Sequence, residues 1–145
     1  MYKVVKTYGH DIGLSCTFRQ WRAKSHCRFL HGYALAFEFT FESEELDANG
    51  WVIDFGALKR LRQALVNQFD HTTIVAADDP ALDDYFRPLG EVQLIDLRIV
   101  ADVGCESFAK WAYHAACRTV TARHVVDCTS VKVSEHGANS AIYCP

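Results

Sequence analysis

The residues from 35 to 42 alternate between large apolar side chains and smaller or polar ones, and this alternation constrains the fold more than any other feature. Side chains two residues apart lie on the same face of a β-strand. The pattern therefore predicts a long strand over residues 33–42, with one face buried and the other solvated or paired elsewhere. The buried face carries Leu35, Phe37, Phe39 and Phe41.

The chain has 145 residues, of which half are apolar and 23% are charged. This size and composition predict one domain, residues 1–145, with a packed core. No apolar run reaches the ~20 residues that span a bilayer, and the N-terminus lacks the apolar block of a signal peptide, so we expect no membrane partner. The net charge of −3 and the lack of a basic run argue against nucleic acid as a partner.

Cysteine use indicates the compartment. Six cysteines would suffice for three disulfides in a secreted protein, but without a signal peptide we expect reduced thiols and a cytoplasmic protein. Most of these thiols are expected to be small core residues. They are Cys16, Cys27, Cys105, Cys117, Cys128 and Cys144.

Two helices are expected. Leucines and a phenylalanine spaced three and four residues apart predict an amphipathic helix over residues 55–69, with Asp54 as its N-cap, after a turn at 47–50. Residues 76–90 are acidic and contain two prolines, so they are expected to form a loop. A second helix is expected to begin at residues 104–106.

Further strands are expected over residues 2–8, 12–18, 92–96, 123–134 and 140–143. In the strand at 123–134, Val125, Val131 and Val133 are expected on one buried face, with Glu135 at its end. Long antiparallel strands with two helices packed on one face of the sheet define an α+β domain.

Cys27 is the first candidate for chemistry. It lies beside His26, Arg28 and Lys24, and nearby positive charge lowers the pKa of a thiol and raises its thiolate fraction. The alternative is a buried structural cysteine.

Asp70 and His71 form a second candidate, directly after the first helix. A carboxylate beside an imidazole fixes the tautomer and stabilises the imidazolium, as an acid–base dyad requires. The alternative is a histidine that binds the last carbonyl groups of the helix.

Two glutamates are candidates for binding a ligand. Glu135 ends an apolar strand face, where a carboxylate must be paired or bound to a polar ligand, or else be solvated. Glu106 lies in the first turn of the second helix, where the helix macrodipole already explains an acidic residue.

A metal site is a further possibility at the start of the long strand. His31 and Tyr33 share a face with the aromatic residues, and zinc prefers Cys and His ligands in tetrahedral sites. Cys16 and His31 are ordinary zinc ligands, whereas Tyr33 is a poor one because its phenol titrates near pH ~10.

The ordered set of motifs resembles the family of 6-pyruvoyl-tetrahydropterin and 6-carboxy-tetrahydropterin synthases, over almost the whole chain. The matching segments are Cys27-Arg-Phe-Leu-His31-Gly32, Leu46-Asp-Ala-Asn-Gly-Trp-Val-Ile-Asp54-Phe55-Gly56, Phe69-Asp70-His71-Thr72, Glu106-Ser-Phe-Ala, and Val133-Ser-Glu135 followed by Ser140-Ala-Ile-Tyr143.

This resemblance implies a tunnelling fold (T-fold), in which small α+β subunits assemble around a central barrel. It implies a homohexamer built as a dimer of trimers, with active sites between subunits. Cys27, Asp70 and His71 match the catalytic residues, and Glu135 matches the pterin anchor, because a carboxylate accepts two parallel N–H bonds from the ring edge. Glu106, in a matching segment, becomes a second candidate for substrate binding.

The resemblance also implies the reaction. The expected substrate is dihydroneopterin triphosphate, whose side-chain oxygens are held by Zn²⁺ while Cys and His–Asp groups transfer protons. One branch of the family yields the pyruvoyl pterin, and the other yields the 6-carboxy pterin on the route to 7-deazaguanine nucleosides such as queuosine. The short spacing from Cys27 to His31 resembles the second branch.

The sequence departs from the family at the zinc ligands, which are usually three histidines. The matching positions here are Cys16, His31 and Tyr33, so two of the three are changed. Two alternatives to a zinc-dependent lyase therefore remain: a pterin- or purine-binding protein without the original catalysis, and a metal-independent pterin aldolase or lyase. The basic segment 18–24 also departs from the family pattern. Two interpretations are open for it: a contact for the substrate phosphate, or a solvated loop.

Overall fold

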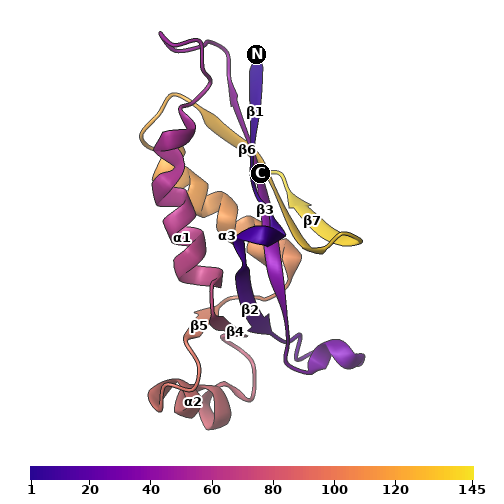
Figure 1. The fold of residues 1–145 in the computed structure, drawn as a ribbon. Helices are drawn as coiled ribbons and strands as arrows, with labels where there is room; N and C mark the ends of the chain where they lie inside the picture. Colours follow the sequence, from indigo (N-terminus) through magenta and orange to yellow (C-terminus); the bar gives the residue numbers. More distant parts are fainter.

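The computed structural model describes all 145 residues, which form one seven-stranded sheet with helices on one side (Figure 1). The strands pair in the order β5-β4-β2-β3-β6-β7, and β1 also pairs with β3. The strands are β1 (Tyr2–Tyr8), β2 (Leu14–Phe18), β3 (His31–Ser43), β4 (Thr72–Ala76), β5 (Leu97–Val100), β6 (Asp127–His136) and β7 (Asn139–Tyr143), and the α-helices are α1 (Lys59–Phe69), α2 (Arg87–Glu91) and α3 (Cys105–Ala116).

The long strand β3 organises the sheet, and its prediction is confirmed. Its first half pairs with β2, with Leu35 opposite Leu14, and its second half pairs with β1, with Phe37 opposite Tyr8. Strand β6 pairs with the other edge of β3 from Ala36 onward. A single strand therefore runs from the aromatic core to the segment that carries His31.

The α+β class is confirmed, but the sheet is mixed rather than antiparallel throughout, because β2 pairs with β4 and β4 with β5 in parallel. Strand β4 was not expected from the sequence. All five of its residues are buried, so it lacks the alternation that identifies a strand with one solvated face. The expected strand at 92–96 is also wrong, since the strand in this region is β5.

The region 76–90 is not the predicted loop. A π-helical turn at Leu82–Phe86 runs directly into α2, and together they lie below β4 and β5 (Figure 1). Leu82 and Phe86 pack with Val75 in a small core of their own. The acidic surface of this segment obscured these two apolar anchors.

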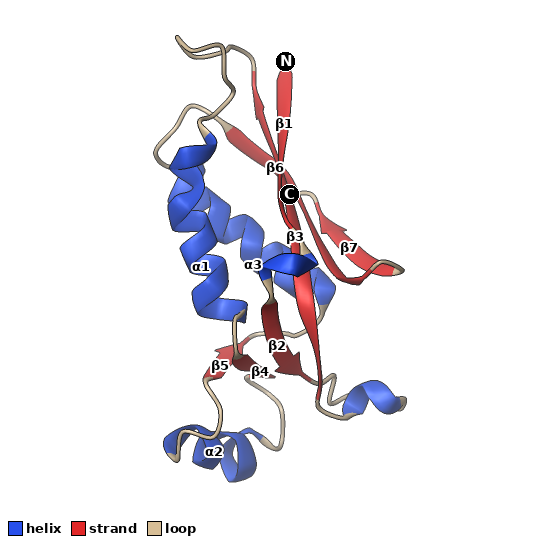
Figure 2. Ribbon diagram, in the orientation of Figure 1, coloured by secondary structure: helices blue, strands red, loops and turns tan.

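Helices α1 and α3 cover one face of the sheet, as predicted (Figure 2). The expected first helix begins as a 3₁₀ turn at Phe55–Leu58, and Asp54 caps that turn by accepting a hydrogen bond from the Gly56 N–H at 2.8 Å. Gly104 precedes α3 with φ 107°, a conformation that side chains disfavour.

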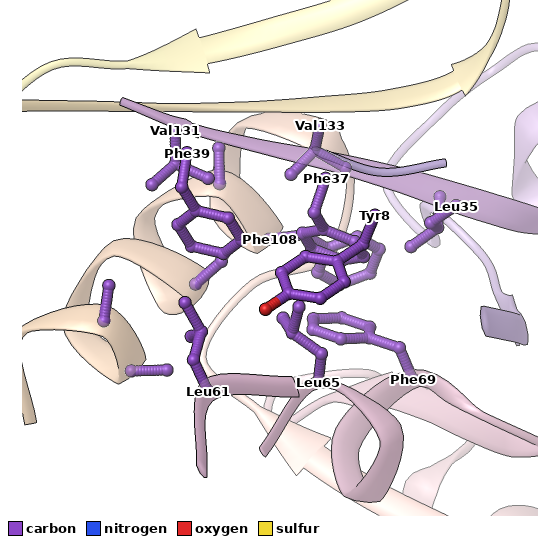
Figure 3. Packing of buried hydrophobic residues seen from close by; sticks show 14 of the residues in the cluster. Tyr8, Leu35, Phe37, Phe39, Leu61, Leu65, Phe69, Phe108, Val131 and Val133 are labelled. Carbon is purple, nitrogen blue, oxygen red and sulfur yellow. The ribbon is translucent and has the colours of Figure 1, made fainter. Parts of the chain in front are cut away.

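The core lies between this face and the two helices, and Figure 3 shows its centre. Phe37 of β3 packs against Phe69 of α1 with ring centroids 4.9 Å apart, and Phe69 in turn packs against Phe108 of α3 at 5.3 Å. All three rings are almost completely buried, and burial of one such side chain stabilises the fold by roughly 1.5–3 kcal/mol.

The strand expected at 123–134 is shifted. Strand β6 begins at Asp127, and Val125 is 95% exposed, so its predicted burial is wrong. A register shift opposite Thr40 and Phe41 places Cys128, rather than an odd-numbered residue, on the buried face, whereas Val131 and Val133 are buried as expected. No helix in the structure has the length and apolar character that crossing a membrane requires.

Candidate functional site

The candidate site lies where β2 and the start of β3 pair. Their register places Cys16 opposite Tyr33 and Phe18 opposite His31, so the four side chains share one face of the sheet. The strands approach closely at Gly32, where a Cβ atom would lie 2.6 Å from the Cys16 carbonyl oxygen. Glycine at this position therefore allows the pairing.

Cys16 belongs to the core. It is 2% exposed, and burial, with a smaller contribution from Cys105, raises the pKa of its thiol to about 12. No three His, Cys, Asp or Glu side chains are arranged to hold a metal ion. The set Cys16, His31 and Tyr33 does not fit the expected zinc site.

His31 is packed as an aromatic ring. Its centroid lies 5.2 Å from that of Phe18 and 5.5 Å from that of Tyr33, the latter edge-on. Its Nδ1 atom lies 2.7 Å from the Phe29 carbonyl oxygen, which can only accept a hydrogen bond. The Nδ1 atom therefore carries a proton and donates it to this oxygen, so Nε2 is the ring nitrogen that remains for other contacts.

Cys27 lies in a short 3₁₀ turn, His26–Arg28, which projects from the end of the sheet (Figure 1). Its backbone N–H donates to the Ser25 side chain at 3.4 Å, and its carbonyl oxygen accepts from the Gln20 N–H at 2.9 Å. The side chain is half-buried. These backbone contacts fix the turn against the segment that leaves β2.

Glu135, Cys27 and Cys105 surround Tyr33. Burial raises the pKa of Tyr33, and the nearby Glu135, Cys27 and Cys105 raise it further. Burial also raises the pKa of Cys105 to about 12, followed by the negative charges of Glu135 and Glu106. The end of β6 and the start of α3 thus bring the Glu135 carboxylate and the Cys105 thiol into contact, and the charges of both act on Tyr33.

Glu135 has no cationic partner. It is half-buried at the end of β6, and none of the eight ion pairs of the chain includes it. The Cys105 thiol lies within hydrogen-bonding reach of it, but no cation neutralises its charge, and such a carboxylate favours a ligand that presents N–H donors. Glu106, by contrast, is exposed in the first turn of α3, where it also interacts favourably with the helix dipole.

The basic segment 18–24 is tied to acidic residues of the same chain. Arg19 donates two hydrogen bonds to Asp79, at 2.8 and 2.6 Å, and Arg22 pairs with Asp78 and Asp102. Neither arginine is thus a free phosphate contact, and Arg19 is not part of a solvated loop. The segment is instead fastened to the turn that follows β4.

Asp70 and His71 form the expected pair, with Oδ1 of the aspartate 2.6 Å from Nδ1 of the histidine. The His71 side chain is 87% exposed, and its backbone has a left-handed conformation with φ 57°. Its N–H donates to the Ser15 carbonyl oxygen at 2.7 Å, which fixes it beside β2.

His71 lines an open cavity of about 840 Å³, together with residues of β2 and β4, among them Cys16, and with residues between Arg87 and Leu97. Cys27, Tyr33 and Glu135 do not line this cavity. Within one copy, His71 and Cys27 therefore do not line a common cavity.

Sequence reasoning missed Cys105 and Asp79. Cys105 is a lone cysteine at a helix start, and nothing in its sequence neighbourhood indicates that Glu135 lies beside it. Asp79 follows Asp78 in an acidic stretch, and its side chain is 1% exposed and pairs with Arg19, 60 residues away in the chain.

Comparison with known proteins decides the family. The sequence model of the 6-pyruvoyl tetrahydropterin synthase family matches residues 10–145. The chain belongs to this family. The resemblance inferred from the sequence is therefore confirmed at the level of the family.

The sequence identity of the chain to individual members of the 6-pyruvoyl tetrahydropterin synthase family is moderate or low. The chain is 40% identical over 57 residues to the 6-carboxy-5,6,7,8-tetrahydropterin synthase of Rickettsia typhi, a match that covers 39% of this chain and spans only 41% of that enzyme. It is 26% identical over 126 residues to the enzyme of the same name from Aquifex aeolicus, covering 77% of this chain and 76% of the relative.

Solved structures confirm the T-fold. An uncharacterized protein from Wolinella succinogenes superposes with a TM-score of 0.84 at 20% identity, covering 99% of this chain and 97% of the other. The 6-pyruvoyl tetrahydropterin synthase of Caenorhabditis elegans gives a TM-score of 0.64 at 15% identity, with 99% and 94% covered. At these identities the likeness establishes the fold alone.

Proposed function

We propose that this protein is a pterin-processing lyase of the 6-carboxy-tetrahydropterin synthase type, with dihydroneopterin triphosphate as its substrate. The observation that carries the proposal is the position of Glu135, a partly buried carboxylate without a cation, close to Tyr33, which also has Cys27 nearby. The relatives in Rickettsia typhi and Aquifex aeolicus carry the name of this enzyme.

Glu135 anchors the ring in this proposal. The amino group and ring N–H of a pterin form a guanidine-like edge, which can donate two parallel hydrogen bonds to one carboxylate. Charge-assisted bonds of this kind fix orientation as well as affinity, so the pterin side chain is held at a defined place relative to Cys27.

Proton transfer falls to Cys27 and His71. Asp70 accepts the Nδ1–H of His71, which fixes the tautomer and leaves Nε2 to take up and return a proton. Because His71 and Cys27 do not line a common cavity in one copy, we propose that a second copy of the chain supplies Asp70 and His71 to each site, in a hexamer of two trimers. The donor set around His31 does not fit zinc, and no step is assigned to a metal.

Turnover of dihydroneopterin triphosphate by the protein, purified without an affinity tag, tests the proposal. Product formation followed by mass spectrometry should fall at least ~100-fold in Cys27→Ala, the usual loss on removal of a proton-transfer group. Cys144→Ala, at an exposed cysteine near the C-terminus, is the control and should retain turnover.

A second candidate function is a pterin-binding protein without catalysis, which the poor fit of the zinc position favours. Tight binding of the substrate without product would select this function over the lyase. Glu135→Gln should weaken binding under either function. Failure of the wild-type protein to bind any pterin would exclude both.

A further inference from the structure

Tyr33 occupies a position that packing fixes closely. Its ring centroid lies 5.5 Å from that of His31, 6.1 Å from that of Phe18 and 6.1 Å from that of His136. Three rings from β2, β3 and the end of β6 thus hold the phenol, and the pairing of Tyr33 with Cys16 fixes its backbone. The hydroxyl group is presented in one direction.

The hydroxyl group of Tyr33 has no partner within the chain. The Tyr33 ring packs against His136, the residue after Glu135, and the charges of Glu135, Cys27 and Cys105 act on it. A phenol with an ordinary pKa near ~10 is a neutral donor at physiological pH. The hydroxyl group is not a buried polar atom, so water can reach it, and a ligand oxygen that replaces this water would accept a hydrogen bond from a donor already fixed in position.

The neighbours of this hydroxyl group define the ligand that it meets. Glu135 takes the donor edge of a ring, and Cys27 lies at the reacting end of the same ligand. Cys16, directly opposite Tyr33, is withdrawn into the core and offers no competing ligand atom. An acceptor for Tyr33 must therefore come from the part of the ligand beside Cys27.

We propose that the Tyr33 hydroxyl group donates a hydrogen bond to an oxygen of the pterin side chain and thereby selects pterins with an oxygenated side chain. This inference rests on the proposed pterin site. It assigns to a neutral hydrogen-bond donor the place at which the sequence would otherwise put a metal ligand, and it makes Tyr33 a specificity-determining residue.

Binding of two probes tests the inference. Neopterin carries a trihydroxypropyl side chain, and pterin carries none. In fluorescence titrations, Tyr33→Phe should weaken neopterin binding about 3–10-fold, the usual effect of one hydrogen bond, and leave pterin binding unchanged. Tyr85→Phe, at a tyrosine that is 68% exposed on the α2 segment, is the matched control and should bind both probes as the wild type does.

The outcomes separate this inference from the proposed function. Equal affinities of wild type and Tyr33→Phe for neopterin, or an equal loss for both probes, would overturn the role of Tyr33 and leave the pterin site intact. Failure of the wild type to bind either probe would overturn the pterin site itself. Unchanged thermal melting of Tyr33→Phe establishes that the fold is retained, since the ring remains.

Metal analysis gives an independent readout. Under the inference, the zinc content of the untagged protein is the same in the wild type and in Tyr33→Phe. One zinc per chain in the wild type that is lost in Tyr33→Phe would identify Tyr33 as a metal ligand and overturn the proposal.

Discussion

Arg19 donates two parallel hydrogen bonds to Asp79, from Nε to Oδ2 at 2.8 Å and from Nη2 to Oδ1 at 2.6 Å. The aspartate side chain is 1% exposed and the arginine 25%. This pair fastens the segment that leads to Cys27 to the turn after β4, and the Arg19 side chain also donates to the Arg28 carbonyl oxygen at 3.3 Å. The position of the thiol thus depends on an ion pair remote from it in sequence.

Loss of this pair should destabilise the protein. Asp79→Ala leaves Arg19 partly buried without its partner, and we expect a loss of about 2–3 kcal/mol in the free energy of unfolding, less than for a fully buried pair because Arg19 is partly exposed. Asp78→Ala removes an exposed pair and should cost less than ~1 kcal/mol. Urea denaturation measures both, and equal losses would contradict a special role for Asp79.

Acid should weaken the same contact. Burial raises the pKa of Asp79, but the hydrogen bonds from Arg19 and the Ala81 N–H, with the arginine charge, outweigh it and lower the pKa below its usual value. The stability from Asp79 is complete above the unfolded pKa of ~3.9 and is lost as the pH falls through the lower folded pKa. Asp79→Asn should therefore lose less stability than the wild type between pH 5 and 3 (about one unit either side of that value), and parallel curves would refute this.

The close approach of β2 and β3 predicts a sharp difference between two glycines. Gly32→Ala places a methyl group 2.6 Å from the Cys16 carbonyl oxygen, and we expect overpacking to cost about 1–3 kcal/mol. Gly137→Ala meets no atom within 4 Å and should have little effect on stability. Thermal melting of both variants tests this, and a Gly32→Ala protein as stable as Gly137→Ala would show that the strands can separate.

The six free thiols should differ in reactivity. Burial is the main cause that raises the pKa of Cys16, Cys105 and Cys128 to about 12, so these thiols stay protonated and shielded near neutral pH. Iodoacetamide labelling with peptide mass spectrometry should modify the exposed Cys144 first and these three only after unfolding. Labelling of Cys16 in the native protein at pH 8 would contradict its burial.

A site shared between copies predicts complementation. Cys27→Ala and His71→Asn should each be inactive, and the asparagine tolerates the left-handed backbone at position 71. Co-assembly of equal amounts of the two variants should restore about one quarter of the wild-type turnover, because a random quarter of the sites receives both intact groups. No recovery in verified mixed assemblies would place Cys27 and His71 of one copy in the same site.

Periodic patterns explain what could be predicted from the sequence. The aromatic alternation of β3 and the leucine spacing of α1 report local geometry, and local geometry determines which face is buried. Strand β4 could not be predicted because its five residues are buried on both faces, so its sequence lacks the alternation of apolar and polar residues. The shifted start of β6 could not be predicted because the register change opposite Thr40 depends on how two strands pair.

In the candidate site, too, contacts between sequence neighbours could be predicted and contacts between distant residues could not. The Asp70–His71 contact is between neighbours in sequence and was expected. The pairing of Arg19 with Asp79 and the approach of Cys105 to Glu135 join residues that are distant in the chain, and nothing in either local sequence identifies its partner. Cys16 is buried in the core, where its strand packs against the helices, as the contact of Phe18 in β2 with Phe108 in α3 shows.

The continuity of β3 limits how this protein can move. Tyr33 and the core residue Phe41 belong to one uninterrupted strand of 13 residues, bonded along both edges for much of its length. Such a strand has no hinge between its ends, so the binding end cannot open as a separate rigid body. In the proposed assembly, entry and exit of a ligand would instead be governed by the turns around Cys27 and by the contacts between copies.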